Sequence, residues 1–185
     1  MKKEQALQYI TNAMNLRTPQ EKSLVLFADF LESNAGKKVL ARMKKEDRES
    51  VSDIEVATKE YTQTIPELNQ FVAFERTFPA YTFALATGVG KTRLMGAFVA
   101  YLYLVYEIQH FMLVAPGNTI YRKLVDDFRK ANNPKYVFRG IQEININTVN
   151  IVTKDDFQQA NTGRLFSNKI QINIFNIQQF AQKDI

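Results

Sequence analysis

The sequence of 185 residues contains no cysteine, no tryptophan and only one histidine, His110. Without cysteine there is neither a disulfide framework nor a thiolate metal site, and one histidine leaves almost nothing for a zinc cluster. Any bound metal must therefore use oxygen ligands. His110 falls at the start of a predicted strand, and we interpret it as a surface residue rather than a catalyst.

Long apolar runs are also missing. The longest, residues 95–105, is far shorter than the roughly 20 residues that a bilayer requires, so it predicts a buried helix. The N-terminus lacks the apolar run and the small-residue cleavage site of a signal peptide. We therefore expect a cytoplasmic protein with no membrane partner.

The charge balance is mildly basic, with a formal net charge of +5. Clustered lysine and arginine release counterions from phosphates, so a polyanionic partner fits this balance. The basic residues are spread along the chain, however, as in many soluble proteins. Charge alone therefore leaves both interpretations open.

Residues 1–78 form a mostly helical N-terminal region in our interpretation. Apolar spacing predicts two helices and a turn within the first 46 residues, with Thr18-Pro19 as a helix start. The mixed-charge run at residues 44–50 indicates a solvated helix end or a linker. Residues 51–78 show no clean period and are left unassigned.

Residues 79–185 alternate between strands and helices, which favours an α/β domain with a parallel sheet and right-handed crossovers. Helices are predicted from Lys91 to about Glu107 and from about Ile120. The predicted strands are residues 81–86, 111–115, 135–138, 149–152 and 170–175. Ligand sites in such sheets lie beyond the carboxyl ends of the strands.

A phosphate-binding loop is predicted where the first of these strands meets the first helix. The loop reads Thr87-Gly88-Val89-Gly90-Lys91-Thr92. The two glycines let successive N–H groups turn toward phosphate oxygens, and the helix adds its positive dipole end. Lys91 would reach the terminal phosphates of ATP, and the Thr92 hydroxyl would complete the shell of Mg²⁺. The usual pattern starts with glycine where Leu85 stands here, and a chance Gly-Lys-Thr in a surface turn is the alternative.

At these residues the sequence resembles superfamily 2 helicases with a DExH box, most of all the helicase (Res) subunit of type III restriction enzymes. The segments that carry the resemblance are 81–95, 111–124 with its Ala-Pro-Gly-x-Thr-Ile, and 172–180. The resemblance implies a P-loop NTPase, RecA-like fold that is partial here. It also implies an ATP-binding N-terminal part of a protein that couples ATP hydrolysis to movement on DNA.

The resemblance further nominates the turn Pro116-Gly117-Asn118-Thr119 for contact with the nucleic-acid backbone, which suits a turn that opens a helix. Asn118 or Thr119 capping that helix is the alternative, and both roles are compatible. The family implies a modification or specificity subunit as partner. For the adenine-reading glutamine of such helicases, the candidates are Gln63 and Gln70, and neither lies in a clear motif.

An acidic strand end, which holds magnesium in such ATPases, is missing. Asp155-Asp156 imitates it, although a solvated helix start is the alternative; Glu107, Asp126 and Asp127 are interpreted as surface charge. We therefore expect a fragment that binds nucleotide but does not hydrolyse it efficiently. Two other functions stay open: another P-loop ATPase, or a non-catalytic module that binds nucleotide or a partner.

Overall fold

The computed structural model describes residues 1–44, 50–66, 71–145, 147–156 and 170–179. Contacts divide the chain into two compact units. Unit 1 comprises Met1–Gln20 with Gly90–Ile185, and unit 2 comprises Glu21–Val89. The functional boundary between residues 78 and 79 stays a prediction.

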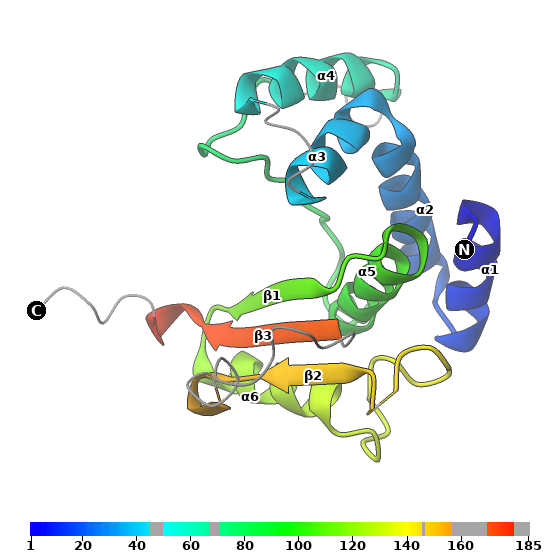
Figure 1. Ribbon diagram of the computed structural model, residues 1–185, viewed down its shortest axis with the longest axis vertical. Coiled ribbons are helices and arrows are strands. Elements are labelled where there is room, and N and C mark those ends of the chain that lie inside the picture. The colour runs from blue at the N-terminus through cyan, green and yellow to red at the C-terminus, as the bar shows by residue number, and fades with distance from the viewer. Residues whose placement is uncertain (45–49, 67–70, 146, 157–169, 180–185) are drawn as a thin grey trace, which may run out of the picture. The chain divides into compact units, whose positions relative to one another are not determined.

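Unit 1 is built on a parallel sheet of three strands, which Figure 1 shows as arrows pointing the same way. Strand β3 (Ile170–Asn176) lies between β1 (His110–Ala115) and β2 (Val149–Val152). Phe111 pairs with Ile172, and Ile172 with Ile151. The strands predicted at 111–115, 149–152 and 170–175 are therefore confirmed, as is the α/β class.

Helix α6 (Asn118–Arg129) packs against all three strands. It buries Leu124 and Phe128, while β3 buries every second side chain, as a strand with one covered face does. The short 3-10 helix η2 (Ile177–Gln179) follows β3. One part of the core of unit 1 thus lies between α6 and the sheet.

The predicted strand at residues 135–138 is wrong, because these residues form turns. Tyr136, Val137 and Phe138 are buried as side chains, but the Val137 N–H donates to the Asp127 carbonyl at 2.9 Å instead of to a neighbouring strand. The interpretation of Asp127 as surface charge is also wrong. Its side chain is 4% exposed and accepts a hydrogen bond from Asn133 Nδ2.

Helix α5 (Lys91–Tyr106) packs on α1 (Lys3–Ala13) within unit 1. Gly96 of α5 lets the turn at Val137 approach closely, since a Cβ there would lie 2.8 Å from the Val137 Cβ. The Arg93 guanidinium donates to the Met14 carbonyl at 2.5 Å. The first helix of the chain is therefore part of the unit that carries the sheet.

Unit 2 contains three helices among its described residues: most of α2 (Thr18–Glu32), then α3 (Asn34–Lys44) and α4 (Val51–Gln63). The expectation of two helices before residue 46 is wrong, because Ser33 ends α2 and its hydroxyl accepts from the Gly36 N–H to open α3. Helix α4, which apolar spacing did not reveal, starts with a reciprocal cap between Ser50 and Asp53.

The strand predicted at residues 81–86 is not a strand. Its aromatic side chains pack on the helices of unit 2: the Tyr81 ring lies 4.4 Å from that of Phe30, and the Phe83 ring 6.1 Å from that of Phe27. The Tyr81 hydroxyl also bonds Thr58 at 3.0 Å. The side chains of this apolar run are thus held by the helices of unit 2, and its residues take no part in the described sheet.

Candidate nucleotide-binding site

Gly90 opens the helix of the phosphate loop. It is the N-cap of α5 and adopts the left-handed region, with φ 94° and ψ 48°. Such a conformation strains any residue with a Cβ, and a Cβ here would lie 2.6 Å from Gln20 Nε2. Glycine is thus required twice over at this position, by the backbone angle and by the neighbouring side chain.

The side chain of Gln20 forms a hydrogen bond with the backbone of Gly90, a contact that the sequence did not predict. Its side chain is 1% exposed. Its Nε2 donates to the Gly90 carbonyl at 2.9 Å, and its Oε1 accepts from the Arg17 N–H at 2.8 Å. A buried amide that is hydrogen-bonded at both ends keeps its position, because breaking either bond leaves a buried polar group unsatisfied.

A signal for Gln20 exists in the sequence. Gln20 shares the helical spacing of the buried residues Leu24, Ala28 and Leu31, so it is a polar residue on an apolar stripe. Of the glutamines that we nominated, Gln63 is exposed at the end of α4 in unit 2, and Gln70 lies outside the described residues. Neither has a described contact with the loop.

Thr87, Gly88 and Val89 end unit 2, whereas Gly90, Lys91 and Thr92 belong to unit 1. Gly88 also has a positive φ, 82°, and among the described residues other than its chain neighbours no atom lies within 4 Å of where its Cβ would be. Both glycines therefore adopt the backbone region that the motif predicts. Lys91 is exposed and Thr92 half-buried in the first turn of α5.

The residues of the first turn of α5 fit a phosphate group. The early N–H groups of a helix have no intrahelical partner, and here a lysine and a hydroxyl accompany them. For Mg²⁺, Thr92 would supply one oxygen ligand, and phosphate and water oxygens usually supply most of the others. Among the described residues, no group of three His, Asp or Glu side chains is arranged to hold a metal.

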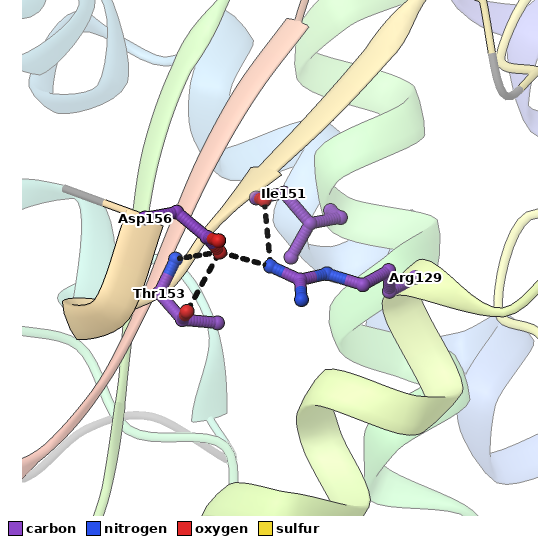
Figure 2. Close-up of polar contacts among 4 residues, drawn as sticks. All are labelled: Arg129, Ile151, Thr153 and Asp156. Carbon is purple, nitrogen blue, oxygen red and sulfur yellow. Dashed lines mark hydrogen bonds and ion pairs between the residues drawn. The ribbon is translucent and has the colours of Figure 1, made fainter. Parts of the chain in front are cut away.

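Asp156 is engaged in a local network beside strand β2, shown in Figure 2. Its Oδ2 accepts from the backbone and hydroxyl of Thr153 at 3.2 and 2.7 Å, and it forms an ion pair with Arg129. Arg129 also donates to the Ile151 carbonyl at 3.0 Å. The Thr153 hydroxyl, followed by Arg129, lowers the pKa of Asp156. This arrangement is that of a helix start.

The other acidic residues that we considered also lie outside any metal site among the described residues. Asp126 forms an i,i+4 ion pair with Lys130 at 2.7 Å, as expected for a surface charge. Glu107 is exposed as the C-cap of α5, and His110 is exposed at the start of β1.

The turn Pro116-Gly117-Asn118-Thr119 follows β1 and opens α6. Gly117 is the N-cap of this helix, and no side chain caps it. The alternative that Asn118 or Thr119 caps the helix is therefore wrong. Instead, Asn118 Oδ1 accepts a hydrogen bond from Asn176 Nδ2 at 2.5 Å, at the end of the neighbouring strand β3.

A helix opened by a left-handed glycine and a parallel sheet covered by a helix are features of an α/β nucleotide-binding domain. The sequence profile of the family described as "Type III restriction enzyme, res subunit" matches residues 13–184, and the chain belongs to this family. It is thus a helicase-like, ATP-binding domain. No curated protein and no solved structure matches the chain. None of the described helices is both long enough and apolar enough to span a membrane.

Proposed function

We propose that the loop Thr87–Thr92 binds the phosphates of ATP and that this chain is the ATP-binding part of a DNA translocase or helicase. The observation that carries the proposal is Gly90, whose left-handed backbone opens α5 directly before Lys91 and Thr92. The family match supports the same reading over most of the chain.

Four residues of the loop have a chemical task in this proposal. Gly88 and Gly90 turn the backbone so that its N–H groups face the phosphates, and Lys91 neutralises the terminal ones. Thr92 contributes an oxygen to Mg²⁺, which when bound offsets the charge of the β and γ phosphates. The Gly90 carbonyl accepts from Gln20 Nε2 and from the Leu94 N–H, so in this proposal it faces away from the phosphates.

DNA is the proposed polyanionic partner, and the turn at residues 116–119 is its proposed contact. Two exposed cations, Arg122 and Lys123, follow one turn later on α6. Neither forms an ion pair within the described residues, whereas Arg129 and Lys130 at the other end of α6 are paired with carboxylates. No carboxylate of the described residues neutralises Arg122 and Lys123 at the end of α6 that carries the turn. This positive charge favours phosphate binding. A modification subunit is a further proposed partner.

The 185-residue chain by itself should bind nucleotide without efficient hydrolysis. Magnesium-dependent ATPases place a carboxylate at the end of a strand beside the loop. In the described residues β1 is followed by Pro116 and β3 by Ile177, and the carboxylate of Asp156 after β2 is bound to Arg129 and Thr153. The complete motor would couple hydrolysis to movement on DNA.

Steady-state ATP turnover, measured with and without duplex DNA, tests this proposal. The chain alone should show no turnover above that of its Lys91→Ala variant. A polypeptide that joins this loop to an acidic strand end should show turnover that DNA stimulates. Steady turnover by the 185-residue chain that Lys91→Ala abolishes would contradict the incomplete-site proposal.

A further inference from the structure

Asn176 is a buried asparagine at the carboxyl end of the strands, where the turn 116–119 lies. It is the last residue of β3, pairs in register with Ala115, and its side chain is 1% exposed. Burying an amide costs folding free energy unless its hydrogen bonds are made. Its partners therefore indicate what it does.

The orientation of the Asn176 amide is fixed by the backbone. The Gln178 N–H donates to Asn176 Oδ1 at 3.1 Å, and a backbone N–H can only donate. The opposite side of the amide must then be Nδ2, which donates to Asn118 Oδ1 at 2.5 Å. It follows that the oxygen of the Asn118 amide faces the sheet and its nitrogen faces away.

Asn118 thereby offers its donors outward. The residue is exposed at the first position of α6, and within the described residues its Nδ2 donates to no other group. The unfilled N–H groups of the first helical turn lie beside it, because no side chain caps this helix. Arg122, four residues on, lies above Asn118 on the same helix face. All these groups favour an anion.

We propose that Asn176 is a positioning residue for nucleic-acid binding: it locks the Asn118 amide so that its two N–H donors, and not its carbonyl, face a backbone phosphate. The inference rests on the proposed DNA contact of the turn. It adds the residue that determines which side of the Asn118 amide faces the DNA. Strand β3 and the turn after β1 act together in this contact, although they lie 58 residues apart in the chain.

The test uses anisotropy of a short labelled single-stranded DNA at low salt, with the 185-residue chain. Asn118→Asp keeps the oxygen that accepts from Asn176 and replaces the outward donors by an anionic oxygen. A carboxylate at the start of a helix is favourable, so the thermal unfolding temperature should be unchanged or raised. DNA affinity should fall about tenfold or more, the scale of a hydrogen bond to a charged group. Asn132→Asp, at an exposed asparagine, controls for the added charge.

A double-mutant cycle separates positioning from a general structural role. Asn176→Ala should weaken DNA binding about threefold, because the Asn118 amide then rotates freely. In an Asn118→Ala background, Asn176→Ala should cause no further loss of DNA affinity. A further loss in that background, or wild-type affinity in Asn118→Asp, would overturn the inference. No DNA binding by the folded wild-type chain would instead overturn the proposed function, and the inference with it.

Discussion

The two glycines of the phosphate loop differ in what a side chain would meet. Both have a positive φ, but a Cβ at Gly88 would meet nothing within 4 Å, whereas one at Gly90 would overlap Gln20 Nε2. Backbone strain is thus common to both positions, and the steric conflict is specific to Gly90. The Gly-x-Gly pattern carries two separate requirements.

Gly90→Ala should therefore destabilise the protein more than Gly88→Ala. The left-handed backbone costs each alanine about 1–2 kcal/mol, and the displacement of Gln20 should add about 1 kcal/mol or more to the cost at Gly90. Urea unfolding of both variants measures the difference. Equal loss of unfolding free energy in the two variants would contradict the role assigned to Gln20.

Asp156 gives a pH-dependent contribution to stability. Its pKa is lowered in the folded state, first by the Thr153 hydroxyl and then by Arg129. A carboxyl group with a lowered folded pKa contributes stability above its unfolded pKa, and this contribution is lost as the pH falls through the folded pKa. Because its side chain is 44% exposed, solvent screens the interaction.

Asp156→Asn should accordingly lower the unfolding free energy near neutral pH by about 1 kcal/mol or less. The difference between the variant and the wild type should shrink as the pH falls below about 4, the ordinary pKa of an aspartate. Chemical unfolding of both proteins across this range measures it. A difference that stays constant with pH would show that the ion pair and hydrogen bonds do not set it.

At the scale of elements, the sequence predicted the helices and strands whose formation depends on residues close together in the chain. Helix α5 and strands β1, β2 and β3 follow from apolar periodicity, with Gly90 marking the start of α5 and Pro116 the end of β1. The runs 81–86 and 135–138 have the same apolar character, but a short run is equally a strand or a packed loop, and only its neighbours decide. Tyr81 packs on Phe30, and Val137 bonds the end of α6.

The residues of the candidate site divide in the same way, into those that act with neighbours in the chain and those that act on distant residues. Gly88, Gly90, Lys91 and Thr92 were predictable because consecutive residues build the loop. Gln20 and Asn176 were not, because each acts on a residue far along the chain: Gly90 is 70 residues from Gln20, and Asn118 is 58 from Asn176. A polar residue at a buried position of an apolar pattern was the one signal that the sequence held.

The packing of α5 depends on Gly96. A Cβ at this position would lie 2.8 Å from the Val137 Cβ and 3.4 Å from the Met14 Cε. Alanine favours a helix over glycine by about 1 kcal/mol, but overpacking a tight contact costs about 1–3 kcal/mol. The clash should win, so Gly96→Ala should lower the unfolding free energy.

Removing the opposing side chain distinguishes this clash from other causes. In a Val137→Ala background the same Gly96→Ala change should cost less, and the helix propensity of alanine should make it neutral or stabilising. Thermal unfolding of the four proteins completes the cycle. An equal cost in both backgrounds would mean that Val137 does not restrict α5.

At the scale of the whole molecule, the phosphate loop begins in unit 2 and ends in unit 1. Gln20 belongs to unit 1 with the sheet and bonds Gly90, so the N-terminal segment contributes a contact to the candidate nucleotide site. In this account, the residues of this loop bind the phosphates of ATP. The central claim is therefore nucleotide binding by this loop.

Calorimetric titration of the chain with magnesium and a slowly hydrolysed ATP analogue tests that claim most directly. Lys91→Ala is the test variant, and Lys59→Ala, at an exposed position of α4, is the matched control. We expect saturable binding by the wild type and the control, and at least about a tenfold loss of affinity in Lys91→Ala, because a charge-assisted contact to phosphate is removed. Equal affinity in all three proteins, or no binding by a folded wild type, would contradict the account.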